Sequence, residues 1–107
     1  MAGVIWAMRA QAEKRKLYLE GRLNFGTRVA NKTAQKIESI QKMLESFPNL
    51  GYREPLLTGL VPIYRTLHIN KRFKIIYCYD KANDTVVIED IWDMHREPQN
   101  LIERMTS

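Results

Sequence analysis

The spacing of apolar side chains changes near the middle of this chain, and no other feature limits its fold as strongly. Over residues 27–47 apolar side chains recur every three or four positions, which predicts a helix with one buried face. Pro48 and Gly51 end that pattern. Over residues 61–93 the period is two, which is typical of β-strands. A block of helix followed by a block of strands predicts an α+β fold.

The same reasoning gives the remaining elements. A short apolar run, Val4–Trp6, predicts a brief strand, and the Ala-, Leu- and Lys-rich residues 8–22 predict a first helix with a thin apolar stripe. The expected antiparallel strands are residues 61–69, 72–79 and 85–93. We expect the two helices to cover one face of this sheet and the other face to be left for solvent or a ligand.

Alternation along the strands assigns side chains to the two faces. In the last strand the core side is predicted to hold Val86, Ile88, Asp90, Trp92 and Met94. In the middle strand it is predicted to hold Phe73, Ile75, Tyr77 and Tyr79. Arg72 and Lys74 then face outward, whereas the pattern leaves open which side of residues 61–69 faces the helices.

The composition is that of one ordinary globular domain, taken as residues 1–107. Of these, 45% are hydrophobic, which is enough to form a core without a disulfide or a structural metal. Cys78 has no second cysteine to pair with, and two histidines do not make a zinc site. We therefore expect no metal, no cofactor and a reducing compartment. No apolar run approaches the roughly 20 residues of a membrane span, so we expect a cytoplasmic protein with no membrane partner.

Positive charge is concentrated in two places. Residues 1–50 contain nine basic and four acidic side chains, and residues 61–79 contain four basic side chains and no acid. Residues 80–97, which follow, carry six acids. A basic segment beside an acidic one predicts an anion site, and a solvated hairpin with scattered Lys and Arg is the alternative.

Short motifs follow one another in a characteristic order along the second half of the chain. They are Tyr64-Arg65, Lys71-Arg72, Phe73-Lys74-Ile75-Ile76-Tyr77, Val86-Val87-Ile88 and His95-Arg96-Glu97-Pro98. Preceded by a Val-Ile-Trp strand and a basic helix hairpin, this order resembles the RelE/ParE family of toxins from type II bacterial toxin–antitoxin systems. The resemblance covers nearly the whole chain. It implies two N-terminal helices packed on one face of a small, mainly antiparallel sheet with a basic concave surface.

The resemblance also implies one of two activities. RelE-like members cut mRNA in the ribosomal decoding site, and ParE-like members are similar in fold but poison DNA gyrase. In both groups a small antitoxin wraps the toxin, and operator DNA is contacted only through the complex of the two. We expect a ribosome-dependent mRNA endoribonuclease, with a gyrase inhibitor as the alternative. A non-toxic relative kept as a binding partner is a third reading.

A metal-independent ribonuclease needs a proton acceptor, a proton donor and cations that stabilise charge on the phosphate. An imidazole side chain can take up and release a proton near neutral pH, so His95 is the expected catalytic residue, with Asp93 on the same strand face to orient its ring. Arg65 and Arg72 complete the expected catalytic set, because a guanidinium binds phosphate through two nitrogens. The expected RNA-binding residues are Lys71, Lys74, Arg96 and Arg53.

These assignments have structural alternatives. His95 can be an ordinary surface side chain, and Asp93 can pair with Arg96 or Lys74. Lys74 stands where many relatives carry arginine, and residues 52–61 lack the lysine cluster of the best-known ribonucleases of the family. The resemblance therefore leaves two possibilities, an acid–base mechanism built on Asp93 and His95 or no nuclease activity.

Overall fold

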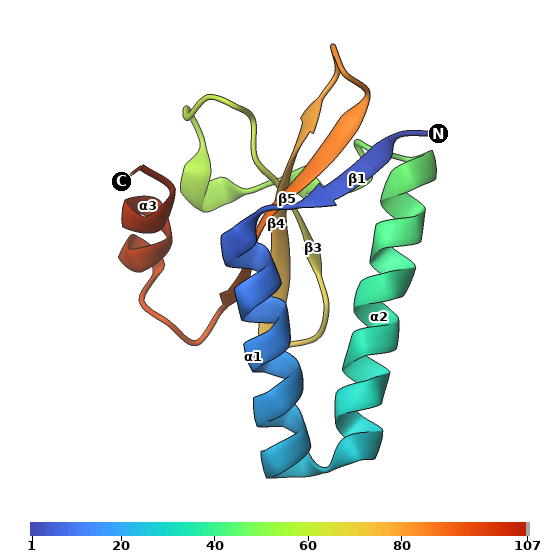
Figure 1. The fold of residues 1–107 in the computed structure, drawn as a ribbon. Helices are drawn as coiled ribbons and strands as arrows, with labels where there is room; N and C mark the ends of the chain where they lie inside the picture. The colour runs from blue at the N-terminus through green and yellow to red at the C-terminus, as the bar shows by residue number, and fades with distance from the viewer. Residues whose placement is uncertain (107) are drawn as a thin grey trace.

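A five-stranded sheet runs through the middle of the molecule (Figure 1). The computed structural model describes residues 1–106. Its elements are β1 (Gly3–Trp6), α1 (Met8–Phe25), α2 (Thr27–Ser46), β2 (Tyr52–Arg53), the 3-10 turn η1 (Pro55–Leu57), β3 (Arg65–His68), β4 (Phe73–Asp80), β5 (Thr85–Asp93) and α3 (Pro98–Thr106). The strand order is β1-β5-β4-β3-β2, with β1 parallel to β5 and every other pair antiparallel. The predicted α+β fold is confirmed.

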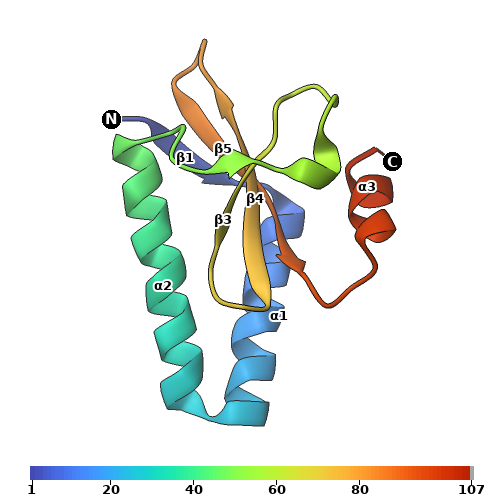
Figure 2. The ribbon, with the colours of Figure 1, turned by 180° about the vertical axis from the view of Figure 1, so that it is seen from behind.

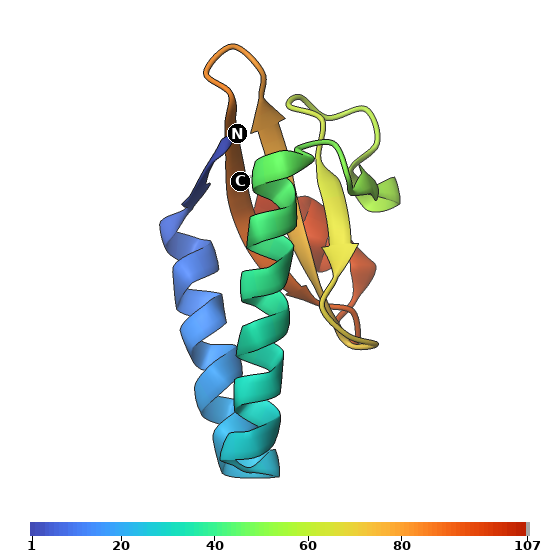
Figure 3. The same ribbon diagram turned by 90° about the vertical axis from the view of Figure 1, so that its right-hand side faces the viewer.

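Helices α1 and α2 form a hairpin that covers one face of the sheet (Figures 1 and 3). A single residue, Gly26, joins them with a φ of 93°, a conformation that glycine adopts without strain. The apolar stripe of α2 is buried as predicted, at Ala30, Ile37, Ile40 and Leu44. Ile37, Ile40 and Leu44 pack on the side of β4 that carries Ile75 and Tyr77, so that part of the face assignment is also confirmed.

The opposite face of the sheet is not open, contrary to the sequence prediction. The turn η1 and helix α3 lie over it (Figure 2) and close a second, smaller core. Its buried members are Leu57, Ile76, Trp92 and Leu101. The covering segments are too short for apolar spacing to reveal them, since η1 has three residues and α3 has nine.

One extra residue in β5 changes which side chains face each core. Tyr77 lies opposite Ile88 and Ile76 lies opposite Asp90, which leaves Glu89 as a β-bulge. Val86 and Ile88 therefore face the helices as predicted, but Asp90 and Trp92 face η1 and α3. The prediction of a single core side for the whole strand was wrong, because a bulge shifts the alternation by one residue.

The strand before β4 is shorter than predicted. The strand expected over residues 61–69 begins at Arg65. The tight turn after it is fixed by Asn70, whose side-chain oxygen accepts hydrogen bonds from the backbone N–H groups of Arg72 and Phe73.

Among residues 1–106, no helix combines the length and the apolar character that crossing a membrane requires.

Candidate functional site

The basic residues expected to form one phosphate clamp lie in separate places. Arg65 is opposite Tyr77, on the sheet face that the helix hairpin covers, and its guanidinium donates to the Gly51 carbonyl at 2.8 Å. The neighbouring Tyr77 hydroxyl accepts a hydrogen bond from the Gly51 N–H at 2.8 Å. Burial raises the pKa of Tyr77 above its ordinary value. Arg65 thus helps to fix the segment before β2 against the sheet.

Lys74 lies on the other face of the sheet, under η1. It was expected to face outward, yet it is only 7% exposed, and that prediction was wrong. Its ammonium lies 2.8 and 2.7 Å from the two carboxylate oxygens of Glu54, which is 2% exposed. Glu54 also caps η1 by accepting from the Leu56 N–H. Lys74 is therefore the buried counter-ion that pins η1 to the sheet.

Four of the predicted site residues do come together, at the corner where β4 begins and β5 ends. Arg72 donates to both carboxylate oxygens of Asp93, at 3.1 and 2.9 Å. The same carboxylate accepts the backbone N–H of His95 at 2.9 Å. Arg96 follows, with its guanidinium 4.9 Å from the Trp92 ring centre. His95 is exposed in the turn that follows the strand, because β5 ends at Asp93 and does not extend to it.

This corner is defined by Arg72, Asp93, His95 and Arg96. Three of its residues, Arg72, Asp93 and Arg96, line a hollow of about 70 Å³ against α1. The helix contributes Glu13, Lys16 and Glu20 to the lining, so both signs of charge surround the hollow. Lys71 is exposed in the adjoining turn, whereas the exposed Arg53 lies opposite Arg65 on β2. The corner offers an imidazole and cations to a ligand, but with fewer free cations than the sequence predicted.

The Arg72–Asp93 pair predicts a small acid-sensitive contribution to stability. The hydrogen bond from Arg72, with the His95 N–H, holds the pKa of Asp93 below its usual range. Folding therefore favours the ionised carboxylate, and this contribution is present above about pH 4 and lost as the pH falls below it. Asp93→Asn should reduce the free energy of unfolding at pH 7 by under about 1 kcal/mol, because Arg72 is half-exposed. Urea denaturation at pH 7 and pH 2.5 measures the difference.

The control for this prediction is Glu103→Gln, which removes an exposed carboxylate from α3. The variant should keep the acid sensitivity of the parent protein. An Asp93→Asn variant whose stability falls as steeply with acid as that of the parent would contradict the assignment.

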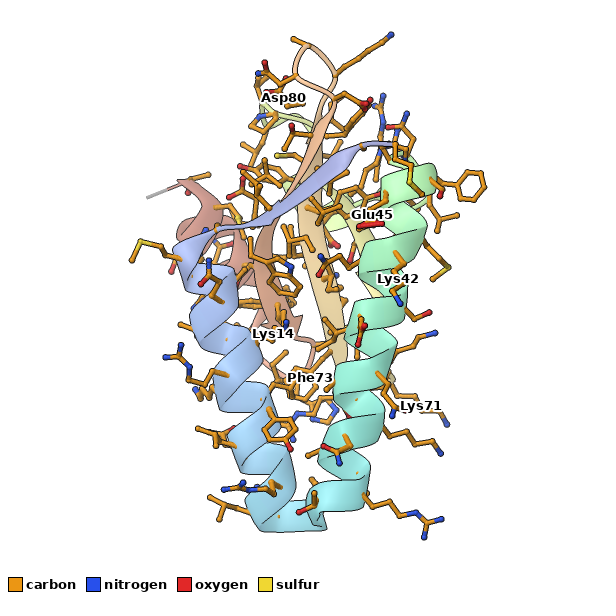
Figure 4. All side chains as sticks on the ribbon, turned by 45° about the vertical axis from the view of Figure 1, so that its right-hand side comes forward. Lys14, Lys42, Glu45, Lys71, Phe73 and Asp80 are labelled. Atoms are coloured by element: carbon orange, nitrogen blue, oxygen red, sulfur yellow. The ribbon has the colours of Figure 1, made fainter. Side chains whose placement is uncertain are left out.

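A larger groove lies elsewhere, between α1 and α2. Its volume is about 700 Å³, and its lining includes Trp6, Leu17, Tyr18, Ala30, Ala34 and Ile37. Lys14 projects from α1 toward α2 (Figure 4), and its ammonium lies 4.8 Å from the Trp6 ring centre. An apolar floor with a basic rim suits a peptide that carries both apolar and acidic side chains.

From the sequence, the floor of this groove is expected to be ordinary core. The signal for it is present in α2, where the stripe carries two alanines, Ala30 and Ala34, one helical turn apart. Small side chains at neighbouring positions cannot fill the space between two helices, so a groove remains. The long stripe residues Ile37, Ile40 and Leu44 close the core further along.

A second buried ion cluster was also missed. Asp90, which is fully buried, accepts from the Arg104 guanidinium at 2.6 and 3.1 Å, and Arg9 lies 3.8 Å away. Burial raises the pKa of Asp90, an effect that the two guanidinium groups oppose. Arg104 also reaches Glu13 on α1 at 3.1 Å. The cluster fixes α3 to the sheet and to the first helix.

Solved structures share this fold. The toxin–antitoxin structure described as a chromosomal ParDE system from P. aeruginosa matches with a TM-score of 0.68 at 24% identity, covering 87% of this chain and 96% of that one. The intact RelBE complex of E. coli gives 0.62 at 13% identity, covering 90% and 100%. A YoeB/ParE toxin from Agrobacterium tumefaciens gives 0.60 at 15% identity, covering 85% and 96%. At these identities the likeness shows the fold.

The sequence itself shows the family. No curated protein sequence matches this chain. A family model described as the ParE toxin of the type II toxin–antitoxin system parDE matches residues 4–98, which contain both helices of the hairpin and the sheet from the second residue of β1 onward. The resemblance to RelE/ParE toxins is confirmed, and the chain belongs to the ParE toxin family of type II toxin–antitoxin systems.

Proposed function

We propose that this toxin acts in the cytoplasm by binding and inhibiting DNA gyrase, without cutting a nucleic acid. The observation that carries the proposal is the separation of the cations that an RNA phosphate clamp needs. Lys74 is held by Glu54 on one face of the sheet, and Arg65 by Gly51 on the other. The match to the ParE toxin family adds support, because gyrase is the target that the resemblance implies for ParE-like members.

A phosphate clamp requires several cations that point at the same phosphate group. Stabilising the charge that develops on a phosphate needs several donors aimed in advance at the same oxygen atoms. Lys74 can reach a phosphate only by leaving a carboxylate 2.7 Å away, and a buried carboxylate left alone costs several kcal/mol. The Arg72 guanidinium is likewise engaged on both oxygens of Asp93. Binding a protein surface requires none of these groups to move.

The groove between α1 and α2 is the part of this proposal that concerns the antitoxin. It combines an apolar floor with Lys14 and Arg15 at its side, and an acidic amphipathic segment complements both features. The P. aeruginosa and E. coli structures that share the fold are toxin–antitoxin assemblies. We assign the groove to the cognate antitoxin, whose binding keeps the toxin inactive.

A supercoiling assay beside an mRNA cleavage assay tests the function. The purified protein should stop purified gyrase from supercoiling relaxed plasmid and should leave ribosome-bound mRNA uncut in a toeprinting assay. Equimolar antitoxin should restore supercoiling. Codon-dependent cleavage with unchanged supercoiling would overturn the proposal.

The second candidate is a ribosome-dependent endoribonuclease, and the corner of Arg72, Asp93, His95 and Arg96 favours it. Asp93 there contacts both Arg72 and the His95 backbone N–H, and Arg96 follows His95 in the same turn. In this candidate His95→Ala abolishes mRNA cleavage and growth arrest while the fold survives. Under the gyrase proposal the same variant inhibits supercoiling as well as the parent protein does.

A further inference from the structure

The α1–α2 hairpin extends well past the end of the sheet. In Figures 1 and 3 its turn lies far beyond the β3–β4 turn, the nearest part of the sheet. This protruding end, here called the hairpin tip, consists of Arg22, Leu23, Phe25, Arg28 and Val29 around Gly26. The residues given above as the lining of the groove between α1 and α2 lie outside it.

Apolar side chains at the tip point into solvent. Leu23 is 81% exposed, Phe25 69% and Val29 45%. Three large apolar side chains within seven residues, on a part of the molecule that contributes little to either core, have no role in stabilising the fold. Exposed apolar groups gathered in this way are typical of a contact surface for another macromolecule.

The two helices are closely tied together at the tip. Its connection is one residue long, and the Gly26 N–H donates to the Arg22 carbonyl while the Ala30 N–H donates to the Gly26 carbonyl. One turn away, Gly21 packs against Ala30, where an added Cβ would lie 3.8 Å from the Ala30 backbone. A surface held in place before binding loses little conformational entropy on binding, which favours affinity.

Charge identifies the kind of surface that the tip fits. Residues 15–32 carry five basic side chains and one acid, Glu20. A second copy of this chain, with its net charge of +5, would place like charges together, which opposes self-association. Leu23 and Phe25 have no complement in a phosphate backbone, whereas an apolar pocket bordered by carboxylates matches both parts of the tip.

We infer that the hairpin tip is the surface that engages the target protein, inserting Leu23 and Phe25 into an apolar pocket that is bordered by acidic side chains. This inference rests on the proposed function and takes gyrase as that target. The antitoxin then binds the groove on the same hairpin, so the two partners use adjacent surfaces and the antitoxin excludes the target by bulk.

The test replaces both apolar side chains by residues that favour a helix. Leu23→Gln/Phe25→Gln should raise the toxin concentration for half-inhibition of gyrase supercoiling at least 100-fold. The matched control, Met8→Gln/Val61→Gln, removes two apolar side chains that are 87% and 94% exposed away from the tip, and should inhibit as the parent does. Circular dichroism and thermal unfolding confirm that both proteins are folded, and Phe25→Gln alone serves if the double variant is not.

Two charge-reversal variants, one at the tip and one away from it, test whether the target surface is acidic. Arg28→Glu should weaken gyrase inhibition at least 10-fold, with a larger effect at low salt. Lys81→Glu, in the loop next to Asp80 at the other end of the molecule (Figure 4), should change it less than twofold.

The outcomes separate the inference from the function. If the parent protein leaves supercoiling unchanged, the proposed function is wrong. If the parent inhibits and the Leu23→Gln/Phe25→Gln variant inhibits equally, the inference alone is wrong. If the variant keeps full gyrase inhibition but no longer binds vesicles of anionic phospholipid that the parent binds, the tip is a membrane contact and the inference is wrong.

Discussion

Glu54→Gln is expected to lower the free energy of unfolding by about 3–5 kcal/mol. The substitution keeps the size of a side chain that is 2% exposed but removes its charge, and the Lys74 ammonium, 7% exposed, then has no counter-ion. An unpaired charge in a site of low polarity is among the costliest single changes in a folded protein. Urea denaturation followed by circular dichroism measures the effect.

The matched control also removes the charge of Lys74. Glu54→Gln/Lys74→Met should recover most of the loss, because replacing both members of a buried pair by neutral groups of similar size is often close to neutral. A double variant as unstable as Glu54→Gln would show that packing of η1, and not the Lys74 charge, causes the loss.

Asp90→Asn is expected to lower the free energy of unfolding by about 3 kcal/mol. This loss is smaller than that of Glu54→Gln because Arg104 keeps Glu13 as a partner. Asp90 is fully buried and serves two guanidinium groups, those of Arg104 and Arg9. The loss should appear first in α3, whose only buried side chain is Leu101 among the described residues. Hydrogen exchange measured by mass spectrometry should show that the substitution accelerates exchange over residues 98–106 more than over α2, relative to the parent protein.

Glu13→Gln is the control for the second cluster. Its carboxylate is 28% exposed and accepts one hydrogen bond from Arg104 Nη2, so its loss should cost under about 1 kcal/mol. Equal effects of Asp90→Asn and Glu13→Gln on the stability of α3 would contradict the central role of Asp90.

The helix side of the molecule could be predicted from the sequence because long elements repeat their pattern. Twenty residues of α2 and the alternating Ile75 and Tyr77 of β4 give several consistent signals for one buried surface. The boundaries of these elements came within a few residues of the observed ones. The family resemblance, carried by motifs in the same strands, pointed to the same arrangement.

The other side could not be predicted, and the reasons are local. Glu89 adds a residue to β5 that no alternation rule detects, so Asp90 and Trp92 were placed on the wrong face. Lys74 looks like an exposed base in a basic strand, and only the fold brings Glu54, twenty residues earlier, against it. Cys78, beside Glu89, is also buried there, and this burial raises its pKa to about 12.

The candidate site was predicted in part. Arg72, Asp93, His95 and Arg96 lie close in the sequence or across one hairpin, and local pairing rules are enough to bring them together. Arg65 differs because its partner, Gly51, belongs to a segment with no regular period before β2. Contacts of that kind depend on how loops pack, which spacing within the chain does not encode.

The bulge at Glu89 lets β5 supply side chains to both cores. Val86, Ile88 and Ile91 must fit the helix hairpin, whereas Trp92 must fit η1 and α3. Residues of β5 that face the hairpin and residues that face η1 and α3 can consequently change during evolution, or be redesigned, with little mutual constraint. A toxin lineage can remodel its helical surface to follow a changing antitoxin, while the opposite side, which the Glu54–Lys74 and Asp90–Arg104 ion pairs hold together, stays unchanged.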